Sequence, residues 1–133
     1  MEADIYSLRS PGDADLIDGS IGELSPFHRT FGYYAHGVGE ETAVLPGGWK
    51  DRLVPLKTPA TGGATGLCLE VHDLEVSKLA AGREKDHEFV RALIRHDLAD
   101  AGVISSRIAL VRLDKALVRA MESRLEQARR GVG

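Results

Sequence analysis

The sequence predicts an α/β fold: a small mixed β-sheet with packed helices and a helical C-terminal end. Strand-like segments alternate with turns rich in glycine and proline in the first part of the chain, and helical spacing of apolar residues dominates the rest. The length of 133 residues, with 43% hydrophobic and 28% charged residues, suits one globular domain. We therefore expect a single domain over 1–133, with the sheet in 1–71 and the helices in 72–133.

The N-terminal third predicts a strand, a weak helix and a second short strand. Residues 2–8 alternate in side-chain direction and include β-branched and aromatic residues, as a strand does. Apolar residues then recur at helical spacing, but Gly22 and Pro26 weaken or break that helix. The helical set is Ala14, Ile17, Ile21 and Leu24, followed by Phe27, Phe31 and Tyr34. A short strand is expected at 34–38.

The middle of the chain predicts a β-hairpin. Residues 49–57 and 67–71 suit strands, and the glycine-rich segment 58–66 suits the turn between them. That turn lacks the Gly-Lys-Ser/Thr ending of a phosphate loop, so a plain turn is favoured. Alternation places Cys68 inward, as a small core residue.

The C-terminal part predicts four helices. Asp73 suits the N-cap of a helix over 74–81 that ends at Gly82, and residues 84–96 follow as the second helix. Ser105 or Ser106 suits the cap of a short third helix, and Asp114 caps the fourth. The predicted inner face of the second helix consists of Phe89, Val90, Leu93 and Ile94, and that of the fourth of Leu117, Met121, Leu125 and Ala128.

Charge and cysteine content narrow the function classes. The formal net charge is −3, which does not imply wholesale binding to nucleic acid, although seven of the 17 Lys and Arg residues lie in 101–133. This basic tail suits either a solvated helix face or contact with phosphate or an acidic partner. The single cysteine excludes an internal disulfide framework, so a cytoplasmic location is the default expectation. We expect no membrane segment, since no apolar run is long enough.

Two carboxylates on the first strand form a candidate metal pair. Glu2 and Asp4 are at positions i and i+2, and so project from one face of a strand. Mg²⁺ prefers hard oxygen ligands and is often held by one or two carboxylates against substrate phosphates. The alternative is an ordinary solvated acidic pair.

Lys78 and Asp86 are charged residues at the edges of two predicted apolar stripes. The stripes run through Leu74, Lys78 and Ala81 and through Asp86, Val90 and Leu93. Because a buried charge is costly unless it is paired, two interpretations stay open. One is a Lys78–Asp86 or Arg83–Asp86 bridge that locks the two helices, and the other is a phosphate-binding lysine beside a positioned acid.

The segment 70–86, with its Ser-Lys-Leu and Arg-Glu-Lys-Asp runs, resembles a family of bacterial nucleotidyltransferase-like proteins that are distantly related to the abortive-infection (AbiEii-type) nucleotidyltransferase toxins. Further similar pieces are Glu2–Tyr6, Ile21–His28, Phe31–Tyr34 and Leu45–Trp49. The resemblance implies a polymerase-β-type core, with a nucleoside triphosphate as substrate and Mg²⁺ as cofactor.

The resemblance also implies roles for individual residues. Glu2 and Asp4 match the metal pair, Lys78 the phosphate-binding lysine and Asp86 the later acid, with Arg83 beside them. The relatives carry a glycine-rich triphosphate turn before the metal strand, whereas this sequence begins at that strand, so it is expected to be N-terminally truncated relative to the family.

The leading hypothesis is a nucleotidyltransferase-like domain, Mg²⁺-dependent by ancestry, whose acceptor is RNA, a protein or a small molecule. Three variants stay open: a fold without catalysis, a site completed by another chain in a homodimer, or a domain repurposed for binding. The rival hypothesis is a non-catalytic ligand- or protein-binding module. Its candidate surfaces are the basic helix over 106–130 and the aromatic cluster of Phe27, Phe31, Tyr33, Tyr34 and Trp49.

Overall fold

The computed structural model describes residues 2–8, 10–38 and 43–131. The chain forms two compact units, residues 1–43 and 44–133. The α/β class is confirmed: helices are combined with one parallel and one antiparallel pair of strands in the described part of the chain. The expectation of a single domain stays a prediction.

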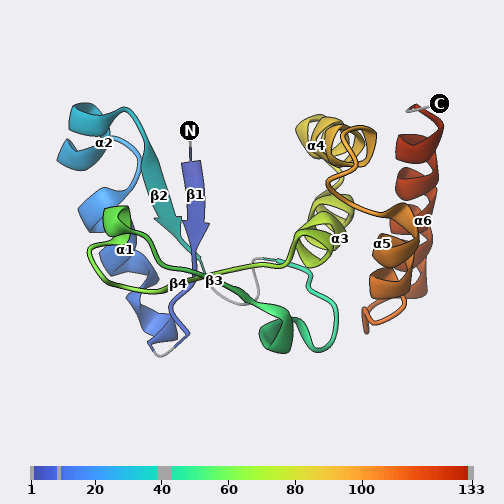
Figure 1. The fold of residues 1–133 in the computed structure, drawn as a ribbon, viewed down its shortest axis with the longest axis horizontal. Helices are drawn as coiled ribbons and strands as arrows, with labels where there is room; N and C mark the ends of the chain where they lie inside the picture. The colour runs from blue at the N-terminus through green and yellow to red at the C-terminus, as the bar shows by residue number, and fades with distance from the viewer. Residues whose placement is uncertain (1, 9, 39–42, 132–133) are drawn as a thin grey trace. The chain divides into compact units, whose positions relative to one another are not determined.

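The first unit is a β-α-β arrangement with two helices between its strands (Figure 1). The strands β1 and β2 run parallel, and Asp4 pairs with His36 in their register. The elements in order are β1 (Glu2–Ile5), the short 3₁₀ helix η1 (Pro11–Asp13), α1 (Ala14–Ile21), α2 (Pro26–Phe31) and β2 (Tyr34–Gly37). The predicted strands over 2–8 and 34–38 are thus present, each shorter than expected.

Glycine sets the end of α1. A Cβ on Gly22 would lie 2.2 Å from the carbonyl oxygen of Asp18, which excludes a side chain there. The helix ends at Ile21 because Gly22 adopts an extended ψ of 179°, and the predicted helical face does not reach Leu24, whose φ is 64°. The chain restarts as α2 because the Ser25 hydroxyl accepts a hydrogen bond from the backbone N–H of His28.

A hydrogen bond from β2 to a side chain of α1 ties these two elements together. Oδ1 of Asp18 accepts from the backbone N–H of Gly37 at 2.9 Å. Ala35 on β2 is buried, whereas several large apolar side chains stay exposed. These are Ile5, Leu8, Leu16, Leu24, Phe31 and Tyr33. The described part of this unit therefore has a small core.

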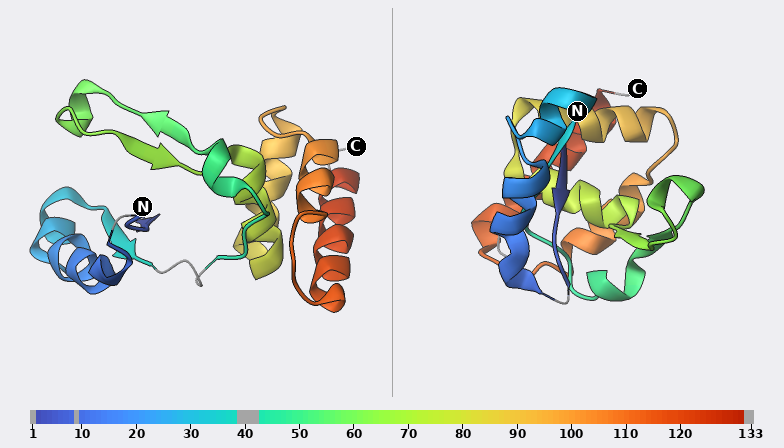
Figure 2. Two further views of the ribbon diagram at one scale, coloured as in Figure 1. Left: turned by 90° about the horizontal axis from the view of Figure 1, so that it is seen from below. Right: turned by 90° about the vertical axis from the view of Figure 1, so that its left-hand side faces the viewer.

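The second unit contains the predicted hairpin near its start. The strands β3 (Val54–Leu56) and β4 (Gly66–Cys68) pair antiparallel, as Figure 2 shows, with the 3₁₀ helix η4 (Pro59–Thr61) in the turn between them. Residues Trp49–Arg52 form the 3₁₀ helix η3 and not the expected start of a strand, because Gly48 at φ 80° turns the chain immediately before them. Cys68 is exposed, so its prediction as a core residue was wrong.

Four helices follow the hairpin and form the core of the second unit. They are α3 (Val71–Ala81), α4 (Glu84–Arg95), α5 (Ala101–Ile108) and α6 (Lys115–Arg130). The predicted N-caps of α3 and α5 were wrong. Glu70 caps α3 in place of Asp73, and Asp100 caps α5 in place of Ser105 or Ser106. A carboxylate just before each helix accepts a first-turn N–H, and this competes successfully with the later candidates.

The core lies between these helices, with α3 packed against α4, α5 and α6 (Figures 1 and 2). Its completely buried apolar side chains include Val76, Val90, Ile104, Ile108 and Met121. Each such side chain contributes about 1.5 to 3 kcal/mol by leaving water. Among the described residues, no helix has both the length and the apolar composition required to cross a membrane.

Candidate functional site

The structure brings Lys78, Arg83 and Asp86 together where α3 ends and α4 begins. The guanidinium of Arg83 donates from Nε to Oδ2 of Asp86 at 2.7 Å and from an Nη to Oδ1 at 3.2 Å. The backbone N–H of Arg83 also donates to Oδ2, at 3.1 Å. Nζ of Lys78 lies 3.6 Å from Oδ1. Both bridges that the sequence left open are therefore present.

Asp86 is the anchor of this cluster. It is 2% exposed, which by itself would raise its pKa, but the hydrogen bonds from Arg83 and the charges of Arg83 and Lys78 hold the pKa below its ordinary value. Because its oxygens already accept from Arg83, Asp86 is suited to holding the two cations in place.

Lys78 is held more loosely than Arg83. The distance of 3.6 Å to Asp86 exceeds that of a good hydrogen bond, and Nζ lies 5.7 Å from the ring centroid of Phe89, near the outer limit of a cation–π contact. The Lys78 side chain is 29% exposed. Its ammonium is thus oriented by two weak contacts and remains open to a solvent anion.

Glu75 is a buried acid that the sequence did not single out. It lies one turn before Lys78 on α3, is completely buried, and neither of its carboxylate oxygens has a hydrogen-bond partner among the described residues. Burial raises the pKa of Glu75 to about 7, and the charge of Lys78 opposes this shift. The expected stripe through Leu74, Lys78 and Ala81 was wrong: the buried face of α3 consists of Asp73, Glu75, Val76 and Leu79.

The candidate metal pair belongs to the first unit. Positions 2 and 4 lie on β1, Asp4 is exposed, and the side chain of Glu2 lies outside the described part. Among the described residues, no group of three or more His, Cys, Asp or Glu side chains is placed to hold a metal ion. An exposed carboxylate on a strand nonetheless fits Mg²⁺, because this ion often takes only one or two protein carboxylates and fills its other positions with water and phosphate.

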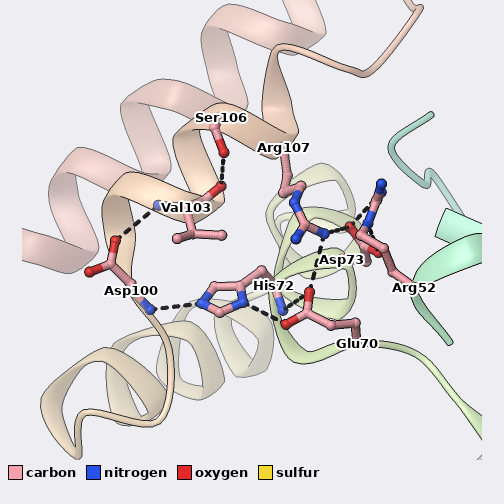
Figure 3. Close-up of polar contacts among 8 residues, drawn as sticks. All are labelled: Arg52, Glu70, His72, Asp73, Asp100, Val103, Ser106 and Arg107. Carbon is pink, nitrogen blue, oxygen red and sulfur yellow. Dashed lines mark hydrogen bonds and ion pairs between the residues drawn. The ribbon is translucent and has the colours of Figure 1, made fainter. Parts of the chain in front are cut away.

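A second polar network, which the sequence did not predict, joins η3, α3 and α5 (Figure 3). Asp73 is completely buried, and its carboxylate accepts hydrogen bonds from Nε and an Nη of Arg52 at 2.8 and 3.0 Å. Nη1 of Arg107 donates to the same carboxylate at 2.8 Å and to Glu70 at 3.2 Å. The hydrogen bond to Asp73 raises the pKa of Arg52. This network ties three elements together and satisfies its buried charges.

His72 extends this network to the start of α5. Its Nε2 accepts the backbone N–H of Asp100 at 3.0 Å, which places the ring proton on Nδ1, 2.6 Å from Oε1 of Glu70. Burial raises the pKa of Glu70, but the hydrogen bonds from His72 and the charge of Arg107 bring it below its ordinary value. Figure 3 shows these contacts running from Arg107 through Glu70 and His72 to Asp100. Because the described partners of each group lie within the chain, we regard the network as structural.

The predicted aromatic cluster is present in part. Phe27 contacts Phe31 and Tyr33, with ring centroids 4.7 and 5.3 Å apart. Tyr34 contacts His28 instead, at 4.6 Å. Trp49 belongs to the second unit, where Lys50 lies over its ring at 5.4 Å. The contacts among Phe27, Phe31 and Tyr33, which are tilted or edge-to-face, are accounted for by packing within α2 and the turn that follows it.

The comparisons with known proteins give one match. A family described as "Nucleotidyltransferase of unknown function (DUF6036)" matches residues 7–128, a range that includes Lys78, Arg83 and Asp86 but not Glu2 and Asp4. No curated protein and no solved structure matches the chain.

Proposed function

Because the chain belongs to this nucleotidyltransferase family, we propose that it binds a nucleoside triphosphate through Lys78 and transfers the nucleotidyl group to an acceptor. In such a transfer, an acceptor oxygen bonds to the α-phosphorus and pyrophosphate leaves. The observation that carries the proposal is the loosely held ammonium of Lys78, supported by Asp86 and flanked by Arg83. Phosphoryl transfer depends mainly on positioning and charge stabilisation, which such cations supply.

Charge favours anion binding at this cluster. Lys78 and Arg83 contribute two positive charges and Asp86 one negative charge, so the three residues carry a net charge of +1. Arg83 is 56% exposed, and Lys78 is partly exposed, so both cations lie within reach of a solvent phosphate. Asp86 acts here as the positioning acid, since the hydrogen bonds from Arg83 leave it unsuited to accept a proton from an acceptor.

We assign the metal role to Glu2 and Asp4. When bound, Mg²⁺ supplies charge neutralisation for the triphosphate oxygens. Asp4 offers an exposed carboxylate on β1 for this ion. The two parts of the proposed machinery belong to different units of the chain, so each is tested by its own substitution.

Calorimetric titration with each of the four ribonucleoside triphosphates, with and without Mg²⁺, tests this function. The proposal predicts binding that requires Mg²⁺ and is lost or weakened at least tenfold in Lys78→Ala. Lys115→Ala is the matched control, because Lys115 is an exposed lysine at the start of α6. Binding that is equal in wild type and Lys78→Ala would refute the role of Lys78.

We also propose that the protein forms a homodimer and that it is related to the abortive-infection toxins. In the described residues β1 and β2 form a two-stranded sheet with no further strand at either edge, and bare edges favour pairing with another chain. Equal mixtures of Asp4→Asn and Lys78→Met test a shared site. Restored nucleotidyl transfer indicates two copies that complete one another, whereas two inactive variants that stay inactive together argue against a homodimer that shares its site.

The non-catalytic binding module remains the alternative function. The observation that favours it is the tight Arg83–Asp86 pair, since a 2.7 Å bridge between the N-cap residue of α4 and a buried acid in its first turn also serves to cap that helix. This alternative predicts no Mg²⁺-dependent binding of any triphosphate, so the same titration separates the two.

A further inference from the structure

The aromatic ring beside Lys78 is more exposed than a core position requires. Phe89 lies on α4, three residues after Asp86, and its side of the helix was predicted to be apolar. Its neighbour Val90 is completely buried, but Phe89 is 38% exposed. A large ring at the edge of the core, next to a cationic cluster, combines the two features that bind a nucleotide: charge for phosphate and a flat apolar surface for the base.

The contact between Lys78 and Phe89 is loose enough to give way. Nζ of Lys78 lies 5.7 Å from the ring centroid, against a limit of about 6 Å for an attractive cation–π contact. Oδ1 of Asp86 is 3.6 Å from the same Nζ. A phosphate competes favourably with both contacts, and the ammonium then moves off the ring without leaving a buried charge unpaired.

We infer that Phe89 is the stacking surface for the base of a nucleotide whose phosphates lie on Lys78 and Arg83. This inference rests on the proposed function, and it adds a recognition element to it. The site then distinguishes a nucleotide from a bare polyphosphate, which the cations alone do not do. Phe89 is a binding residue in this account, separate from the residues that hold phosphate.

The test compares ATP with inorganic tripolyphosphate, both titrated calorimetrically into the full chain in the presence of Mg²⁺. Stacking on an aromatic side chain is worth enough to predict a loss of about tenfold in ATP affinity for Phe89→Leu. Tripolyphosphate affinity stays within twofold of wild type in that variant. Lys78→Met weakens both ligands, and Phe89→Tyr restores ATP affinity because it keeps the ring.

A second readout does not depend on how well a truncated side chain packs. In Phe89→Trp the new indole becomes a fluorescent reporter in the proposed stack. We expect ATP to quench its emission and tripolyphosphate not to do so, with the emission of the natural Trp49 subtracted through the wild-type titration.

The outcomes separate the inference from the proposed function. Equal weakening of ATP and tripolyphosphate in Phe89→Leu would mean that Phe89 only supports Lys78, and the inference falls while the function stands. Equal affinity of the wild type for the two ligands would have the same meaning. Failure of the wild type to bind either ligand would overturn the proposed function and the inference together.

Discussion

The ammonium of Lys78 lies 3.6 Å from Oδ1 of Asp86, while the guanidinium of Arg83 holds Oδ2 of the same carboxylate at 2.7 Å. One buried acid thus has a firm partner and a loose one. The firm pair caps the start of α4. The loose contact leaves the Lys78 side chain 29% exposed and within reach of a solvent anion, and on this difference the proposed phosphate site depends.

Asp86→Asn should destabilise the protein by about 2 kcal/mol, because it weakens three hydrogen bonds made to a charged and buried acceptor. Urea unfolding at pH 7 measures the change. Since the pKa of Asp86 is lowered on folding, its contribution is fully present above the unfolded value of 3.8 and is lost as the pH falls through the lower folded value. Glu88→Gln, an exposed change on the same helix, should stay within about 0.5 kcal/mol of wild type. Equal effects of the two substitutions would argue against the anchoring role.

Glu75→Gln should change how stability depends on pH. The folded pKa of about 7 lies above the unfolded value of 4.5, so the folded protein binds the proton more tightly. The Glu75 contribution is therefore fully present below pH 4.5 and is lost as the pH rises to about 7, by about 3 kcal/mol. The difference in unfolding free energy between wild type and Glu75→Gln, measured from pH 4 to 8, should show this change.

Glu122→Gln is the control for that series, because Glu122 is exposed on α6. Its difference from wild type should stay flat across the same pH range. A flat difference for Glu75→Gln as well would show that the buried carboxyl does not titrate in this window.

Asp73→Ala should cost about 3 to 5 kcal/mol, because it leaves the guanidinium groups of Arg52 and Arg107 without their shared buried partner. The loss should release η3, so the emission of Trp49 in that helix should shift to longer wavelength before global unfolding. Asp51→Ala, an exposed change in η3, should leave both properties near wild type. A small effect of Asp73→Ala would mean that the network does not hold η3 in place.

Gly82→Ala should destabilise by at least about 1 kcal/mol, since Gly82 ends α3 at φ 65° and a Cβ there would lie 2.4 Å from the guanidinium carbon of Arg124. That guanidinium donates to the carbonyl oxygens of Leu79 and Ala80, so it cannot move aside without cost. The matched change Gly19→Ala lies inside α1 with open space around it and should be neutral or stabilise by up to about 1 kcal/mol. Thermal unfolding of both variants checks this contrast.

Local signals explain what the sequence predicted well. Gly82 and Asp114 mark helix boundaries that the structure has, and the glycines of the turn after η4 adopt the positive φ that a turn needs. The Lys78–Asp86 contact was also among the predicted alternatives. Lys78 and Asp86 lie on consecutive helices at the edges of predicted apolar stripes, where a charge needs a partner.

Tertiary contacts explain what the sequence did not predict. The sequence predicted a strand over 67–71 and Asp73 as a helix cap, whereas Asp73 lies inside α3 and is buried through its pairing with Arg52 and Arg107, 21 and 34 residues away. The burial of Glu75 likewise follows from the packing of α3 against three helices, which helical spacing along α3 alone does not indicate. The signal in the sequence for this network was the pair of acids Glu70 and Asp73 at the start of α3, together with the distant arginines Arg52 and Arg107.

The most direct test of the central claim is a double-mutant cycle of Lys78→Met and Arg83→Met, read out as affinity for ATP in the presence of Mg²⁺. If both cations hold the phosphates of one bound nucleotide, their effects should not add, and the coupling should be about 1 kcal/mol. Additive effects to within about 0.3 kcal/mol would contradict a shared phosphate site, and wild-type affinity in both single variants would contradict the proposed roles of both residues.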